Sequence, residues 1–196
     1  MIGCGETSWV SNPSNPNNVL IEKAIRKQLK KVDPTHHAQE GELTKADLEK
    51  ITHLNLYGNK LTEVPKELEK LTQLRVLNLY DNQLTDGKGL EKLTQLETLR
   101  LSDNQLTDVK GLEKLTQLKT LHFDGNKLTD VKGLEKLTQL WYLSLNDNQL
   151  TDVKGLEKLD QLTHLYLNDN PDLTKAQIAE LRKALPKCYI YSNPTK

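Results

Sequence analysis

The sequence is poor in aromatic residues and in cysteine. It contains one Phe, two Trp and six Tyr among 196 residues, so a hydrophobic core must be built mainly from aliphatic side chains. Its two cysteines, Cys4 and Cys188, are too few for the dense disulfide framework of small secreted domains. A single bridge joining the chain ends stays an alternative. No apolar run is long enough to cross a bilayer.

The chain also lacks an excess of charge of either sign. Lys and Arg number 27, as do Asp and Glu, which argues against nucleic-acid binding through a basic face and gives no polybasic membrane patch. No nucleophile elbow, phosphate loop, HExxH motif or paired-carboxylate signature is found. We therefore expect a protein without catalytic residues, cofactor or metal.

What the sequence does contain is an internal repeat of about 22 residues, a period typical of solenoids. The stretch LETLRLSDNQLTDVKGLEKLTQ begins at Leu96, and near copies begin at Leu74, Leu118 and Leu140. A longer copy starts at Ile51 and a diverging one at Leu162. The shared pattern L-x-x-L-x-L-x-x-N-x-L resembles the leucine-rich repeat family in its short 22-residue class, over about three quarters of the chain.

The resemblance implies an α/β solenoid, an arc with a parallel concave β-sheet and short 3₁₀ or irregular convex legs. We expect a disordered tether at 1–18, a helical N-terminal cap at 19–50, about six rungs at 51–172, and a C-terminal cap helix, terminal strand and tail at 173–196. Apolar residues at helical spacing predict the first cap helix, starting near Asn17 or Asn18. A basic amphipathic helix on a membrane is the alternative for this segment.

The start of the chain resembles the end of a bacterial lipoprotein signal. In Ile2-Gly3-Cys4 a small residue precedes a cysteine, and a polar Ser/Asn/Pro stretch follows. The resemblance makes Cys4 a lipidation candidate, and we expect the apolar segment that such a signal needs to lie upstream in the precursor. The alternative is a free cysteine in a flexible tail.

Within each rung, alternation predicts a short strand with two inward apolar residues, followed by a turn and a return leg. In this family a ladder of asparagines binds the backbone at the turn; here the ladder would be Asn59, Asn82, Asn104, Asn126, Asn148 and Asn170. Gly87 stands where other rungs have valine, which predicts a packing defect. Aligning Leu185 with Leu162 places Cys188 and Ile190 inward on a terminal strand.

The outward strand positions vary between rungs and form three columns on the concave face. Aromatic residues gather at the C-terminal end of these columns, where they offer rigid contact area with a polar group. The predicted ligand-binding patch consists of His122, Trp141, Tyr142, His164, Tyr166, Tyr189 and Tyr191. The alternative is that aromatic residues simply suit a sheet surface.

Two further clusters are given a structural interpretation. His122 and His164 lie two rungs, roughly 10 Å, apart, which is too far for one zinc ion. Asp81, Asp103, Asp147 and Asp169 precede ladder asparagines; turn chemistry explains them, with weak Ca²⁺ binding or a basic partner as the alternative.

The resemblance to bacterial leucine-rich-repeat lipoproteins implies a monomeric, non-enzymatic binding module on the cell envelope. Its concave face would bind a protein or peptide. A glycan-binding surface protein is one alternative. A cytosolic regulatory subunit of an enzyme such as a phosphatase is another, because the 22-residue class resembles phosphatase-regulating repeat proteins.

Overall fold

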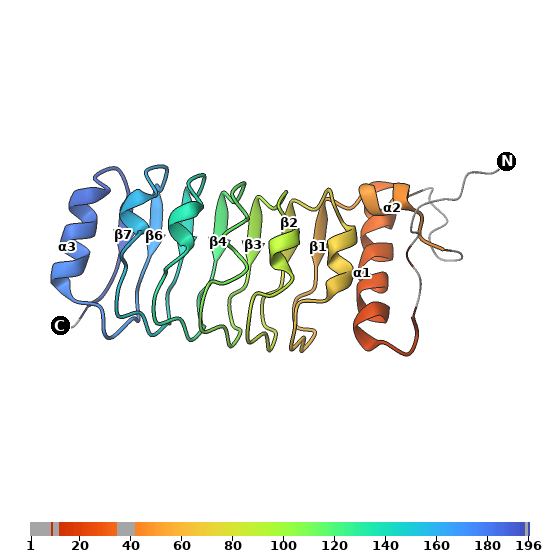
Figure 1. Ribbon diagram of the computed structural model, residues 1–196, viewed down its shortest axis with the longest axis horizontal. Coiled ribbons are helices and arrows are strands. Elements are labelled where there is room, and N and C mark those ends of the chain that lie inside the picture. Colours follow the sequence, from red (N-terminus) through yellow and green to blue (C-terminus); the bar gives the residue numbers. More distant parts are fainter. Residues whose placement is uncertain (1–8, 10–11, 35–41, 195) are drawn as a thin grey trace.

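The protein is an elongated solenoid whose strands form one parallel sheet in chain order (Figure 1). The computed structural model describes residues 9, 12–34, 42–194 and 196. The strands are β1 His53–Asn55, β2 Val76–Asn78, β3 Thr98–Arg100, β4 Thr120–His122, β5 Tyr142–Ser144, β6 His164–Tyr166 and β7 Tyr189–Tyr191. This architecture confirms the predicted α/β solenoid. Among the described residues, no helix has the length and apolarity needed to cross a membrane.

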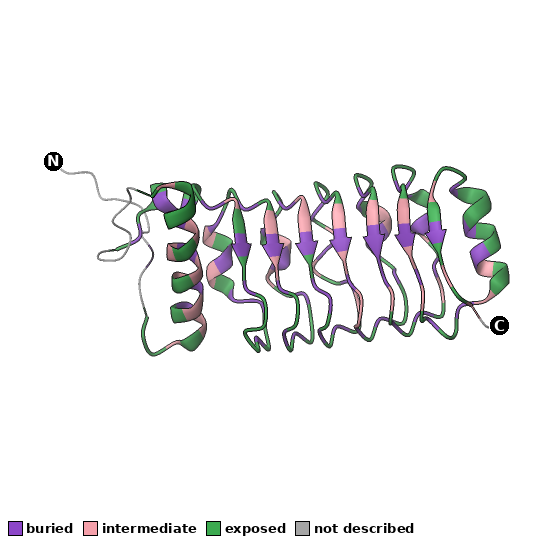
Figure 2. Cartoon of the chain, turned by 180° about the vertical axis from the view of Figure 1, so that it is seen from behind, coloured by how far each residue is buried: buried purple, intermediate pink, exposed green. Residues whose placement is uncertain are grey.

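A ladder of leucines holds the strands in register. The central residue of each strand points into the core and pairs with the central residue of the next, as Leu77 does with Leu99 and Leu99 with Leu121. Figure 2 shows this buried stripe running across all seven strands between more exposed positions. A fully buried Leu contributes about 1.5–3 kcal/mol, and the buried apolar residues form one cluster from Trp9 to Ile190.

The return legs run along the opposite side of the sheet through short 3₁₀ turns. These are η1 Lys66–Lys70, η2 Leu90–Lys92, η3 Leu134–Lys136 and η4 Leu156–Lys158. Gly89 precedes η2 with φ 99° and Gly133 precedes η3 with φ 113°, a conformation that favours glycine. The leg between β3 and β4 passes through simple turns.

This exception coincides with a close approach of two backbones. A Cβ atom on Gly87 would lie 2.5 Å from the carbonyl oxygen of Lys110, and one on Gly111 would lie 2.4 Å from the carbonyl oxygen of Gly87. The predicted packing defect at Gly87 is therefore wrong. The missing side chain is what lets the second and third return legs pack directly against each other.

Buried asparagine amides join neighbouring rungs. The Asn104 amide donates to the carbonyl oxygens of Leu79 and Leu101, both at 3.0 Å, and its Oδ1 accepts from the Leu84 backbone N–H at 3.0 Å. Equivalent bonds are made by Asn82, Asn126, Asn148 and Asn170.

Asn59 departs from the predicted ladder. It is exposed, and its amide donates to the Tyr57 carbonyl oxygen of its own rung at 3.0 Å. The physical reason is its place in the first rung, since no earlier rung offers it a carbonyl group.

The N-terminal cap begins earlier than the sequence predicts. Helix α1 spans Pro16–Val32, and the Asn15 side chain accepts hydrogen bonds from the backbone N–H groups of the second and third helical residues. A proline at the first helical position suits its fixed φ, so the predicted start at residue 19, capped by Asn17 or Asn18, is wrong. The inner face of α1 buries Ile21, Ile25 and Leu29 completely.

Trp9 lies in the predicted tether but packs into the cap. It is only 1% exposed, its backbone N–H bonds the Leu43 carbonyl oxygen at 3.0 Å, and its Nε1 donates to Glu22 at 3.1 Å. The Lys70 ammonium lies 5.5 Å from the centre of its ring. A disordered tether over the whole of 1–18 is therefore wrong at this point, because a buried tryptophan has both an apolar site and a hydrogen-bond partner. Cys4 lies outside the described residues.

Two further helices complete the caps. Helix α2, Lys45–Glu49, has a capping box formed by Thr44 and Asp47. Helix α3, Lys175–Ala184, has one formed by Thr174 and Gln177, and it lies at the far end of the solenoid (Figure 1).

Strand β7 pairs two residues out of the predicted alignment. Tyr189 lies beside His164 and Ile190 beside Leu165, so Cys188 precedes the strand and does not occupy an inward strand position. A shift of two residues keeps every side chain on its face of the sheet, which is why the sequence pattern could not exclude the wrong register. Cys188 is half-buried, and burial raises the pKa of its thiol to about 11.

Candidate binding face

The outward side chains of the seven strands form columns on the face seen in Figure 2. With the corrected register, Tyr189 joins the column of Tyr142 and His164, and Tyr191 joins the column of His122 and Tyr166. The predicted register had placed Tyr189 in the column of His122 and Tyr166, and Tyr191 in the next column toward the turn. Both still belong to the C-terminal end of the face.

Rings of the predicted patch contact one another without a break from β4 to β7. The His122 and Tyr142 rings are 4.8 Å apart between centroids, and Tyr142 and Tyr166 are 5.3 Å apart. Tyr166 stacks on Tyr191 at 4.7 Å, with an angle of 10° between the ring planes. These separations lie in the range of favourable aromatic pairs. These ring contacts thus hold each ring in place before any ligand binds.

A second branch of rings widens the patch. His164 lies 5.6 Å from Tyr189 and 6.5 Å from Trp141, which contacts Tyr142 edge-on at 5.9 Å. Trp141, Tyr189 and Tyr191 are 45%, 65% and 45% exposed, whereas the other four rings are half-buried. The structure therefore brings all seven predicted residues together and leaves the rim most accessible.

Asp124 organises a polar network beside the patch that the sequence reading did not identify. Its carboxylate accepts from the Ser102 hydroxyl at 3.1 Å, from the Asn146 backbone N–H at 3.0 Å, and from the Ser144 hydroxyl. Both serines are buried although their positions face outward. Ser and Asp at neighbouring outward positions were the available signal, and the network fixes the centre of the face.

His122 sits between this network and the rings. Burial and, next, the nearby Arg100 guanidinium lower the pKa of its imidazole, while the Asp124 carboxylate raises it in part. A lowered pKa favours the neutral form of this ring, and with it a contact between two uncharged rings at Tyr142.

The N-terminal end of the sheet carries a smaller aromatic pair. Tyr57 and Tyr80 stack at 5.1 Å with an angle of 7° between their planes, and both rings are exposed. A hydrogen bond from the Tyr80 hydroxyl to the Asp103 carboxylate, and then the charge of that carboxylate, raise the Tyr80 pKa. Alternation along the first two rungs places both tyrosines on the outward side of the sheet and does not predict that they pair.

The aspartates before the ladder asparagines have a conformational role. Asp81, Asp103, Asp147 and Asp169 have φ between 51° and 57°, the left-handed region that Asp and Asn tolerate better than most residues. This supports the turn interpretation. His122 and His164 lie on β4 and β6 with β5 between them, and the described part of the chain holds no group of three metal-ligating side chains.

Comparison with known proteins decides the family. The sequence model described as "Leucine Rich repeats (2 copies)" matches residues 49–92, 94–136 and 138–183, which is more than half of the chain. The chain is a leucine-rich repeat protein. A search of curated proteins found no match.

Solved structures of bacterial leucine-rich repeat proteins are similar to this chain. A leucine-rich repeat protein of Leptospira interrogans is 38% identical with a TM-score of 0.68, over 74% of this chain and 38% of its own length. Internalin C2 of Listeria monocytogenes is 26% identical with a TM-score of 0.67, over 93% of this chain and 90% of its own. The Listeria internalin InlF is 25% identical with a TM-score of 0.64, over 90% and 57%. This leucine-rich repeat chain thus spans less than two thirds of the Leptospira protein.

Proposed function

We propose that this leucine-rich repeat protein binds a protein or peptide through the aromatic patch on its concave face. Leucine-rich repeat proteins are generally protein-interaction modules and typically not enzymes. The observation that carries the proposal is the continuous set of seven ring contacts, half-buried at its centre and exposed at its rim. Binding hot spots are commonly aromatic residues held in this way.

We further propose display on a bacterial envelope through a lipid on Cys4. The three solved structures compared above come from bacteria, and Ile2-Gly3-Cys4 fits a lipidation site. Mass spectrometry of the native membrane fraction tests this part, and the expected result is an acylated Cys4 at the N-terminus of the mature chain. An unmodified Cys4 in the cytosolic fraction would contradict it.

The concave site is tested by paired variants in a pull-down from envelope extract. Tyr142→Ala with Tyr166→Ala should abolish capture of the partner, because truncating a true anchor costs about 2 kcal/mol or more. Both side chains point away from the leucine core, so the thermal melt should remain close to that of the wild type. Lys132→Ala with Lys154→Ala, on the outer face, is the matched control and should retain the partner. The opposite result would move the site to the outer face.

A glycan is the second candidate ligand, favoured by the exposure of Trp141 and Tyr189 at the rim of the patch. Aromatic faces of this kind can stack on sugar rings. A glycan array separates the two candidates. Reproducible binding to one glycan, lost in the Tyr142→Ala/Tyr166→Ala variant, would replace the protein partner by a sugar.

A further inference from the structure

The outward face of α1 carries a concentration of positive charge that the neutral composition of the whole chain conceals. The helix contains five basic residues and one acidic residue. Its exposed stripe consists of Val19 and four lysines, namely Lys23, Lys27, Lys30 and Lys31. These positions are three or four residues apart and so lie on one side of a helix.

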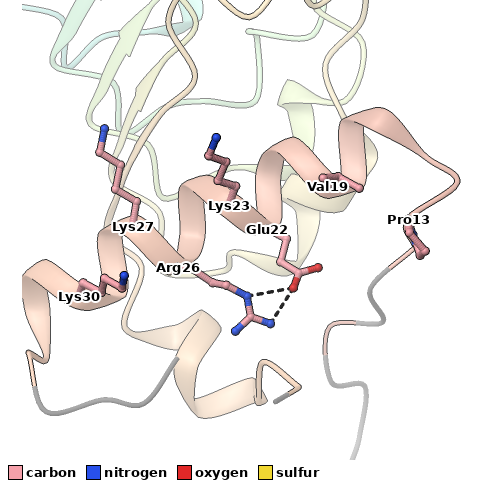
Figure 3. Close-up of a pocket in the computed structure, with 7 residues that line it drawn as sticks. All are labelled: Pro13, Val19, Glu22, Lys23, Arg26, Lys27 and Lys30. Carbon is pink, nitrogen blue, oxygen red and sulfur yellow. Dashed lines mark hydrogen bonds and ion pairs between the residues drawn. The ribbon is translucent and has the colours of Figure 1, made fainter. Parts of the chain in front are cut away.

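The acidic residue of α1 does not neutralise these lysines. Glu22 is half-buried and bonds Arg26, with its carboxylate 2.6 Å from one guanidinium nitrogen, and it also accepts from Trp9. Within the described part of the chain, none of the four lysines has an ion pair. Figure 3 shows Lys23 and Lys27 extending away from the Glu22–Arg26 pair, along an open groove of about 760 Å³ that also includes Val19 and Pro13.

The position of α1 places this stripe at the end of the molecule. Helix α1 lies at the N-terminal end of the solenoid (Figure 1) and packs its Ile21, Ile25 and Leu29 face against the first rung. The lysine stripe lies on the opposite side of the helix. The apolar face is already occupied by the core. A contact made through the four lysines is therefore electrostatic and leaves the apolar inner face of the helix in the core.

Trp9 determines how far this face can be from a lipid on Cys4. Its side chain is fixed in the cap by the Leu43 and Glu22 bonds, and it follows Cys4 by five residues in the sequence. Five residues span at most about 18 Å when fully extended. A chain anchored at Cys4 thus stays close enough to the bilayer for the lysines to approach within one Debye length of it, about 8 Å at physiological salt, where its charge is felt.

We propose that the lysine stripe of α1 docks on anionic phospholipid headgroups and stands the solenoid on the membrane by its N-terminal end. The proposal rests on the envelope display proposed above and extends it to a defined orientation. The aromatic patch, which runs from β4 to β7, then lies toward the far end of the molecule (Figure 1). The lipid at Cys4 attaches the chain to the membrane, and the lysines determine how the solenoid is oriented on it.

Sedimentation with vesicles tests the docking without any lipid on the protein. The full chain with Cys4→Ser is mixed with vesicles of phosphatidylglycerol and phosphatidylcholine, or of phosphatidylcholine alone. We expect binding to the anionic vesicles, weakening as salt is raised, and no binding to the neutral ones. Each lysine near an anionic surface contributes roughly five-fold to partitioning, so Lys23→Gln with Lys27→Gln and Lys30→Gln should weaken binding about 100-fold.

The matched control removes the same charge from the other end of the solenoid. Lys158→Gln, Lys183→Gln and Lys187→Gln change exposed lysines of the last return leg and C-terminal cap and should leave vesicle binding unchanged. A melt confirms that both triple variants are folded. Equal loss in the two variants, or undiminished binding by the α1 variant, would overturn the proposal.

These outcomes are separate from those of the proposed function. Acylation of Cys4 and capture of a partner by the aromatic patch are measured independently of the vesicles. If both hold while the unacylated chain ignores anionic vesicles, the orientation alone is overturned. If the vesicles are bound and Cys4 is not acylated, the docking face is supported and the lipid anchor is contradicted.

Discussion

Inward and outward residues of one rung differ sharply in what a truncation should cost. Leu121 is completely buried in the leucine ladder, so Leu121→Ala should destabilise the protein by about 2–5 kcal/mol. Lys110 is exposed and pairs with Asp108 across 2.8 Å at the surface, so Lys110→Ala should change stability by less than about 0.5 kcal/mol. Urea denaturation of both variants measures the difference. Similar costs would contradict the assignment of the two faces.

Gly87 is the position where a single methyl group should matter most. Its Cβ would meet the Lys110 carbonyl oxygen at 2.5 Å, and that atom belongs to the backbone of the next rung. Gly87→Ala and Gly87→Val should therefore both destabilise, by about 1–3 kcal/mol as overpacked sites do. Valine occupies the equivalent place in later rungs, so a gain in stability on Gly87→Val in a denaturant melt would show that the legs can separate at no cost.

His122 should make the folded protein sensitive to acid. Burial and Arg100 lower its pKa in the folded state, so the unfolded chain binds a proton first as the pH falls below about 6.5. Stability is then fully present above that pH and decreases as the pH falls toward the folded pKa. His122→Gln should remove this part of the loss between pH 7 and pH 5, as measured by urea denaturation at each pH. An unchanged pH profile of unfolding in His122→Gln would contradict the prediction.

At the scale of the element, the asparagine ladder should contribute unequally along the chain. Asn104→Ala leaves the carbonyl groups of Leu79 and Leu101 and the N–H group of Leu84 without their partner. Buried groups left unpaired cost about 1–3 kcal/mol, so a loss of at least about 2 kcal/mol is expected. Asn59→Ala should be nearly neutral because its bond is exposed. Equal melting temperatures for the two variants would be inconsistent with the ladder as described.

The elements also show where the sequence was sufficient and where it was not. The repeat predicts the sheet, the return legs and the inward leucines, because the same apolar pattern occurs in every rung. The caps have no repeat to support them: the sequence missed the start of α1 at Pro16, the buried Trp9, and the register of β7. Trp9 stands among Ser, Asn and Pro residues and therefore resembles a loop residue in the sequence. Its buried site is formed by Leu43 and Glu22, which are distant in sequence.

The sequence predicted which residues form the candidate site. It did not predict how exposed they are or which hydrogen bonds surround them. Alternation and the alignment of the rungs place six of the aromatic residues on one face and Trp141 at its edge. The sequence pattern could not rank their exposure, which depends on how adjacent rings cover one another, nor foresee the bonds of Asp124. Those bonds join Asp124 to serines of the two neighbouring rungs, which lie 20 and 22 residues away in the sequence. Only the register of the finished sheet brings these side chains together.

For the whole molecule, stability should behave as a chain of neighbouring contacts. In a solenoid each repeat contacts mainly the repeats beside it. Trp9→Ala should cost about 3–5 kcal/mol at the cap, and hydrogen exchange should quicken in α1 and β1 while β5 and β6 keep their protection. A loss of protection spread evenly from β1 to β7 would show instead that the solenoid opens as one unit.

The Gly87–Gly111 contact has a consequence for how such a chain can change in length. Return legs of nearly identical sequence allow recombination to add or remove whole repeats, since a new rung finds the same neighbour on each side. The second and third rungs do not follow this rule. Each presents a bare backbone to the other, so a duplicated valine-bearing leg inserted between them would collide with Lys110. We therefore expect the fold to accept an added valine-bearing repeat in its C-terminal half and to be destabilised by one inserted at this junction.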